Sequence, residues 1–166
     1  MDVALVPAGV EQKALFVQLF QLYAYDFTEV TGDDPGHDGL FRVPPLDRYW
    51  QEPWWRPFLL HVGGACAGFV IVSGRSRRVE GLERWDMAEF FVLRRHRRAG
   101  VGTRAAILAF NAFPGPWEVR QMARATAATA FWRKVIDRYT TGQFEEVAWK
   151  DDRWRETVQR FESPPK

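Results

Sequence analysis

The first half of the chain alternates short apolar runs with one long amphipathic segment. Residues 3–6 form an apolar run closed by a proline, which predicts a strand. Apolar side chains recur near helical spacing over residues 10–30, so we expect a helix there, ended by the turn residues of 31–39. The proline-rich and aromatic segment 40–57 predicts irregular structure with a short helical turn near residues 46–50.

A strand hairpin opens the next part of the pattern. Two apolar runs, residues 58–62 and 66–72, are separated by Gly63 and Gly64, and a Gly-Gly pair is a common hairpin turn. The elements that follow are predicted to be a strand at 85–93, a helix at 102–113, a strand at 117–122, a helix at 126–140 and two strands at 144–150 and 155–161. This order predicts a mixed sheet covered by helices.

Length and composition indicate one folded domain over residues 1–166. Hydrophobic residues make up 46% of the chain, which places it far from the composition of disordered proteins. The net charge of +2 creates no strong field for a polyanion, so any basic function must be local. Cys66 is the single cysteine and only three histidines are present, so we expect neither an internal disulfide nor a metal site.

The sequence carries no recognisable targeting or membrane segment. Its first residues include acids and only a short apolar run, unlike a signal or transit peptide. No apolar run approaches the roughly 20 residues of a membrane helix. Together with the lone cysteine, these features predict a soluble cytoplasmic protein without a membrane partner.

A basic loop with two glycines joins the strand that ends at Leu93 to the helix that opens at Gly102. The first N–H groups of a helix lack internal acceptors and lie at the positive end of its dipole, so this junction attracts phosphate. Glycine at positions 100 and 102 permits turn dihedrals closed to other residues and keeps side chains away from an anion. The spacing matches neither the GxxxxGKS/T loop of nucleotide triphosphate-binding proteins nor GxGxxG.

The segment from Arg97 to Gly102, RRAGVG, has the pattern R-x-x-G-x-G and resembles the signature of the GNAT superfamily of acyl-CoA-dependent N-acyltransferases. The predicted element order is similar to the whole GNAT fold, and FWRKV at 131–135 is similar to that family's F-Y-x-K segment. The segments YDF, LDRYW, PFLL, MAEFFVLRRHRRAGVG and AFWRKVI together resemble a bacterial branch of predicted acetyltransferases. The resemblance implies an α/β (α+β) fold with a GNAT-like, mixed and mostly antiparallel sheet of about seven strands flanked by helices.

The resemblance also implies acetyl-CoA as co-substrate, with its pyrophosphate on the backbone amides of the loop and its pantetheine arm along the fourth strand. The implied cofactor-binding residues are Phe91, Val92, Arg97, Arg98, Ala99, Gly100, Val101, Gly102, Thr103, Arg104, Phe131 and Trp132. Some of Arg94, Arg95, Arg97, Arg98 and Arg104 would add charge-assisted contacts to phosphate. A solvated basic face is the alternative interpretation of these arginines.

Candidates for catalysis lie on the fourth strand and the last helix. Glu89 lies two residues before Phe91, hence on the same strand face, and the resemblance makes it the candidate general base through a water. A structural carboxylate paired with an arginine is the alternative. Trp132 stands where relatives often have a tyrosine that protonates the thiolate, which an indole cannot do. Tyr139, seven residues later on the same helical face, is the substitute candidate, and Ala125 replaces a frequent asparagine.

These residues predict an acetyl-CoA-dependent N-acetyltransferase in which the amine of a small molecule or a protein attacks the thioester directly. Candidates for the acceptor pocket come from the first helix and the irregular segment: Tyr23, Tyr25, Asp26, His37, Asp38, Tyr49 and Trp50. A non-catalytic acyl-CoA-binding or sensor domain is the alternative, which Trp132 would permit. The near-balanced net charge disfavours a nucleic-acid partner for residues 94–98, and the aromatic-rich composition favours a homodimer.

Overall fold

The computed structural model describes residues 2–76, 79–151 and 155–165, and these contain one seven-stranded sheet. Its strands are β1 (Val3–Pro7), β2 (Trp55–Val62), β3 (Ala65–Arg75), β4 (Glu83–Val92), β5 (Gly115–Met122), β6 (Glu145–Lys150) and β7 (Arg155–Ser163). They lie in the order β1-β2-β3-β4-β5-β7-β6, and every neighbouring pair is antiparallel except β4 and β5. The predicted fold class, a mixed and mostly antiparallel sheet, is confirmed.

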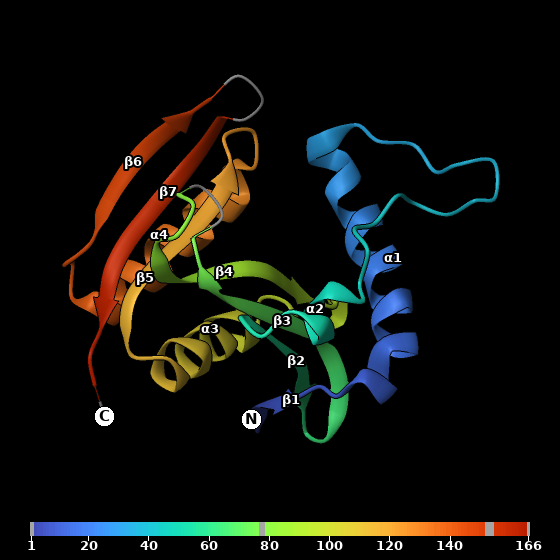
Figure 1. The fold of residues 1–166 in the computed structure, drawn as a ribbon, viewed down its shortest axis with the longest axis horizontal. Helices are drawn as coiled ribbons and strands as arrows, with labels where there is room; N and C mark the ends of the chain where they lie inside the picture. Colours follow the sequence, from blue (N-terminus) through green and yellow to red (C-terminus); the bar gives the residue numbers. More distant parts are fainter. Residues whose placement is uncertain (1, 77–78, 152–154, 166) are drawn as a thin grey trace.

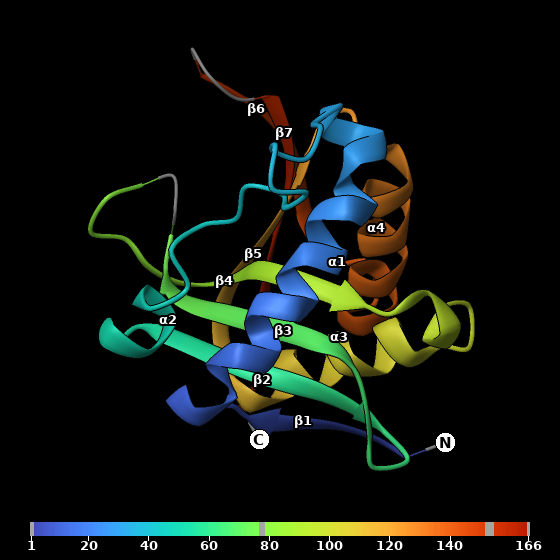
Figure 2. The same ribbon diagram turned by 90° about the vertical axis from the view of Figure 1, so that its right-hand side faces the viewer.

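Helices cover both faces of this sheet. The α-helices are α1 (Lys13–Thr31), α2 (Arg48–Gln51), α3 (Val101–Ala112) and α4 (Thr126–Thr140), and 3-10 turns lie at η1 (Val10–Gln12) and η2 (Arg94–His96). Figures 1 and 2 show α1 across one face of the sheet and α3 and α4 on the opposite face. The predicted long helix therefore begins as a 3-10 turn, and the short helical segment predicted near residues 46–50 is α2.

Alternation along β3 supplies core residues to both faces of the sheet. Phe69 faces α1, where its ring stacks on that of Phe20 with centroids 4.7 Å apart. Val70 faces the other way and joins the core of α3 and α4 with Phe110 and Trp132. Because successive strand residues point to opposite faces, one buried apolar run supplies both layers.

The hairpin of β2 and β3 turns at the predicted Gly-Gly pair. Gly63 has φ 56° and Gly64 has φ 81°, which are the left-handed conformations that a two-residue hairpin turn requires. Val62 pairs with Ala65 directly across the turn. The glycines therefore bring Val62 and Ala65 into register across the β2–β3 turn.

Gly68 on β3 controls how closely β4 can approach. It has φ 148°, and a Cβ there would lie 2.0 Å from the carbonyl oxygen of Phe91. We therefore expect Gly68→Ala to lower the free energy of unfolding by about 2–4 kcal/mol, measured by urea denaturation. Gly64→Ala is the matched control, because φ is also positive there but no atom lies within 4 Å of the added Cβ, so its cost should be about 1 kcal/mol. Equal losses in the two variants would contradict the close approach.

Candidate functional site

β4 and β5 pair over only two positions at the centre of the sheet. Trp85 lies opposite Trp117 and Asp86 opposite Glu118, in parallel register. Beyond these positions β4 continues beside β3, whereas β5 continues beside β7. Within the described residues, the edge of β4 that faces β5 therefore has no strand partner from Met87 onward. Its backbone groups can bind an extended ligand that runs along the strand.

A buried ion pair lies where the two strands separate. Arg120 of β5 donates to Asp86 of β4, with Nη2 2.6 Å from Oδ2, and its Nη1 lies 3.6 Å from Oε1 of Glu156 on β7. Burial lowers the pKa of Arg120, but the charge and hydrogen bond of Asp86 outweigh it and raise the pKa above its ordinary value. One arginine thus joins three strands at this point. The sequence does not indicate this cluster, because only the pairing of β4, β5 and β7 brings its members together.

The loop after β4 turns the chain sharply into α3. The 3-10 turn η2 follows Leu93, whose carbonyl accepts from the N–H of His96 at 2.9 Å. Arg98 (φ 61°) and Gly100 (φ 79°) then both adopt left-handed backbone conformations. Glycine adopts this conformation at little cost, whereas at Arg98 it is strained.

The start of α3 presents a run of unpaired backbone amides. The N–H of Arg104 donates to the carbonyl of Gly100 at 3.1 Å, which begins the helical ladder. From Arg98 to Thr103 no backbone N–H has an acceptor within residues 2–76, 79–151 and 155–165. These amides lie at the positive end of the α3 dipole, so the predicted loop can bind a phosphate or diphosphate.

The two glycines of the loop have different environments. A Cβ on Gly100 would meet no atom within 4 Å. A Cβ on Gly102 would lie 3.2 Å from Cζ of Phe131 on α4 and 3.7 Å from Cε1 of Phe90. The missing side chain at Gly102 therefore makes room for the packing of α3 against α4, a role that sequence analysis did not predict.

Phe131 and Trp132 lie beside this packing contact. The ring of Trp132 meets that of Phe90 edge to face at 4.8 Å, and the Phe131 ring is 5.0 Å from the Trp132 ring. Trp132 is 6% exposed, so its indole is part of the core. The structure thus packs the start of α3 and the first half of α4 against Phe90 near the end of β4.

Two arginines of the loop are bound to α1. Asp26 accepts from Arg94, with Nε 2.9 Å from Oδ1, and accepts from Arg97 through its other oxygen. The Nε of Arg97 also donates to the carbonyl of Val92 at 2.7 Å. The hydrogen bond and charge of Asp26 raise the pKa of Arg94 above its ordinary value. These two arginines therefore brace the loop on α1.

Glu89 faces α1, and its carboxylate accepts hydrogen bonds from two tyrosines. The hydroxyl of Tyr23 on α1 lies 3.1 Å from Oε2, and that of Tyr49 on α2 lies 3.4 Å from Oε1. The ring of Tyr23 also contacts the ring of Phe91, with centroids 5.5 Å apart, so Glu89 and Phe91 share a face. The strand register shifts at Ala88, which gives β4 a bulge directly before Glu89.

The remaining acceptor candidates are dispersed. Tyr25 is 56% exposed on α1, and His37 and Asp38 lie in an exposed turn. Trp50 donates its indole N–H to the carbonyl of Ala8 at 2.9 Å. Tyr23 and Tyr49 are therefore the members of the predicted set that the structure places on Glu89.

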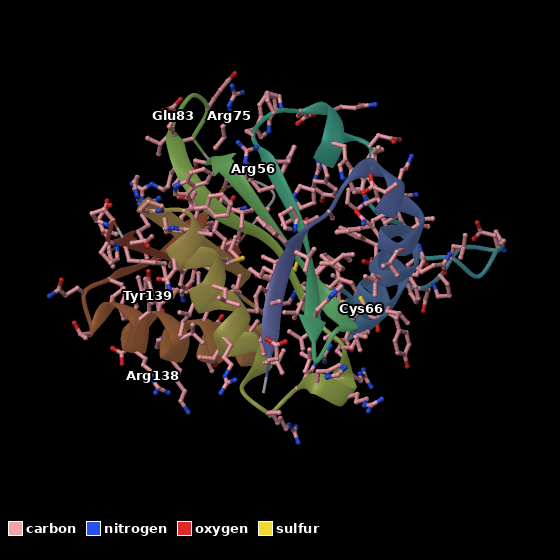
Figure 3. All side chains as sticks on the ribbon, turned by 90° about the horizontal axis from the view of Figure 1, so that it is seen from below. Arg56, Cys66, Arg75, Glu83, Arg138 and Tyr139 are labelled. Atoms are coloured by element: carbon pink, nitrogen blue, oxygen red, sulfur yellow. The ribbon has the colours of Figure 1, made fainter. Side chains whose placement is uncertain are left out.

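Tyr139 lies at the other end of the sheet from the loop. Its hydroxyl is 2.9 Å from Oδ1 of Asn111 at the end of α3 and 2.8 Å from Oγ of Ser163 on β7. In Figure 3 it lies far from Cys66, which marks the end of β3 that adjoins the end of β4. The structure does not bring Tyr139 to Glu89.

No family model matches the sequence, and no curated protein matches it. Solved structures match nearly the whole chain. An acetyltransferase from Thermus thermophilus superposes with a TM-score of 0.66 at 19% identity, covering 98% of this chain and 97% of that one. A GNAT-family acetyltransferase from Desulfovibrio desulfuricans gives 0.64 at 12% identity, with 98% and 99% covered. An aminoglycoside acetyltransferase in complex with coenzyme A gives 0.67 at 12% identity, with 97% and 95% covered.

The chain has the GNAT fold. The likeness extends over nearly the whole length of the chain. No helix of the described ranges has the length and apolar content needed to cross a membrane.

The position of Tyr139 in the GNAT fold leads to a test. Tyr139→Phe removes a hydroxyl that joins α4 to α3 and β7, so we expect the free energy of unfolding to fall by about 1–2 kcal/mol in urea denaturation. Affinity for coenzyme A, measured by calorimetry, should stay unchanged because the loop is at the other end of α3. Unchanged stability together with lost turnover would instead assign Tyr139 to the chemistry.

Proposed function

We propose that the chain is an acetyl-CoA-dependent N-acetyltransferase that transfers an acetyl group to an amine. The observation that carries the proposal is the run of unpaired amides from Arg98 to Thr103, next to the unpaired edge of β4. Solved structures with the same fold include an aminoglycoside acetyltransferase with coenzyme A and a streptothricin acetyltransferase from Bacillus anthracis with acetyl coenzyme A. Their bound ligands support the choice of co-substrate.

The two features suit the two ends of acetyl-CoA. A diphosphate needs several N–H donors in one concave backbone segment, which the amides from Arg98 onward supply. The pantetheine arm carries amides that can pair with a strand edge, and β4 presents such an edge from Met87 to Phe91. The thioester would then lie near Glu89, which is in the middle of that edge.

The reaction requires an acceptor amine to lose a proton as it attacks. The amine nitrogen forms a bond to the thioester carbonyl carbon, the carbon–sulfur bond breaks, and coenzyme A leaves as a thiolate that then takes up a proton. Glu89 takes the proton from the amine through a water. Tyr23 and Tyr49 hold its carboxylate in one orientation by donating to both oxygens.

The acceptor is the amine of a small molecule or of a protein. Structures of this fold carry names as different as spermidine N-acetyltransferase and ribosomal-protein-S18-alanine N-acetyltransferase, so the fold does not select an acceptor. The residues that would face it here lie on α1 and α2, where Tyr23 and Tyr49 reach Glu89.

A domain that binds acyl-CoA without catalysis is the second candidate. Trp132 favours it, because this buried indole stands beside Phe90 at the position where the family resemblance implies an acid. The two candidates differ in the release of coenzyme A. Free thiol should appear with a panel of primary amines if the chain is a transferase, and with none of them if it only binds.

Acetyl-CoA should raise the melting temperature of the protein. At a concentration of 100 times Kd the stabilisation is about 2.7 kcal/mol, which is roughly 5–10 °C for a domain of this size. Gly100→Glu should abolish this shift in melting temperature, measured by differential scanning fluorimetry. The new carboxylate would lie at the N-terminus of α3, where the diphosphate is proposed to bind, and would repel it. Gly64→Glu is the matched control, with the same left-handed φ in an open turn, and should keep the shift. A shift that survives in Gly100→Glu would place the anion elsewhere.

Glu89→Gln should lower kcat by roughly 10²–10⁴ and leave affinity for coenzyme A unchanged, because the amide cannot accept the proton. Turnover is followed by free thiol release with the best amine of the panel. Glu83→Gln, an exposed position on the same strand, is the control and should keep full activity. If both variants turn over as the wild type does, Glu89 is not the base.

A further inference from the structure

Asp26 is the contact through which α1 holds the loop after β4. Its side chain is 16% exposed and receives two guanidinium groups, one on each oxygen, from Arg94 and Arg97. The two arginines lie at the beginning and just after the end of η2. A carboxylate that accepts from both therefore fixes the whole turn against α1.

The Arg97 side chain is held at more than one point. Its Nε donates to the carbonyl of Val92 at 2.7 Å, and its guanidinium lies 5.7 Å from the centroid of the Phe91 ring. Asp26 takes the other end of the same guanidinium. These contacts fix the Arg97 guanidinium between Val92 and Asp26, and so limit how far the Arg97 backbone can move.

The next residue, Arg98, has a strained backbone. Arg97 is extended, with φ −75° and ψ 161°, and the chain then reverses into the left-handed region at Arg98, with φ 61°. A residue with a Cβ in this region keeps it only where surrounding contacts hold it. The unpaired amides from Ala99 onward follow Arg98, so its φ and ψ decide where those N–H groups point.

We propose that Asp26 is a positioning residue for coenzyme A, which acts by fixing Arg97 and thereby holding Arg98 in its left-handed conformation. The inference rests on the proposed function and adds a residue of α1 to the cofactor site. Asp26 touches neither the amides nor the acceptor in this role. Without the contact between Asp26 and Arg97, Arg98 leaves its left-handed conformation. The N–H groups that follow it then no longer point toward one concave site.

The test measures affinity for coenzyme A by isothermal titration calorimetry in a double-mutant cycle. Asp26→Asn keeps the shape of the side chain but loses the charge, and we expect affinity to fall about tenfold, in line with the cost of an unsupported left-handed residue. Arg98→Gly removes the strain, because glycine adopts φ 61° without steric cost. In the double variant Asp26→Asn/Arg98→Gly, affinity should return to within about twofold of Arg98→Gly alone.

Asp26→Asn/Arg95→Gly is the matched control. Arg95 lies in η2, three residues before Arg98, and its side chain is exposed. Replacing it with glycine removes one positive charge and adds flexibility, as Arg98→Gly does, but relieves no strain at Arg98. Affinity should stay about tenfold below that of Arg95→Gly alone. Arg97→Lys tests the Asp26–Arg97 contact from the loop side. Affinity for coenzyme A should again fall about tenfold, because an ammonium group cannot make both guanidinium hydrogen bonds.

The outcomes separate the inference from the proposed function. A wild-type chain that does not bind coenzyme A overturns the proposed function, and the role of Asp26 with it. If the wild type binds coenzyme A and Asp26→Asn binds it equally or more tightly, the positioning role alone is overturned. The same holds if Asp26→Asn/Arg98→Gly stays about tenfold weaker than Arg98→Gly. An increase confined to the KM for the acceptor amine would move Asp26 to the acceptor site and also overturns it.

Discussion

The separation of β4 from β5 is the constraint on which the rest of this structure depends. Two parallel residue pairs hold the strands together, and Arg120, bound to Asp86 and near Glu156, closes the junction from one face. If the β4–β5 ladder were longer, the backbone N–H and C=O groups on this edge of β4 would be hydrogen-bonded to β5. Because the ladder stops, the same groups are left for a ligand, and the loop that follows β4 opens into the same region.

A single helix reaches both parts of the site that lies beyond this junction. Tyr23 and Asp26 are three residues apart, so they lie on the same face of α1. Tyr23 donates to Glu89 in the strand, and Asp26 binds the arginines of the loop. Any shift of α1 along the sheet would therefore disturb the Glu89 carboxylate and the loop after β4 together.

The polar contacts of α1 are supported by its apolar packing. Phe20, one turn before Tyr23, stacks on Phe69 of β3, and Tyr23 packs edge to face on the same ring at 5.5 Å. These aromatic contacts bury large apolar surfaces and resist sliding of the helix, which the weaker polar contacts alone would not. The core on this face thus sets the distance between the Tyr23 hydroxyl and the Glu89 carboxylate.

Local patterns in the sequence were enough to predict most of the elements and the loop. Helical periodicity, the Gly-Gly turn and the R-x-x-G-x-G segment each depend on neighbouring residues, so a sequence records them directly. The side-chain partners could not be predicted in this way. Tyr23 and Glu89 are 66 positions apart, and Asp26 and Arg97 are 71 apart, and their contacts require the bulge at Ala88 and the strand register.

The sequence by itself thus determined the order of the elements and the position of the glycine-containing loop between β4 and α3. Only the tertiary structure decided that Gly102 makes room for Phe131, that Tyr139 lies away from Glu89, and that Arg120 closes the strand junction. The physical reason is that a turn or a helix is set by interactions over a few residues, whereas a buried ion pair or an aromatic contact is set by how distant strands and helices pack.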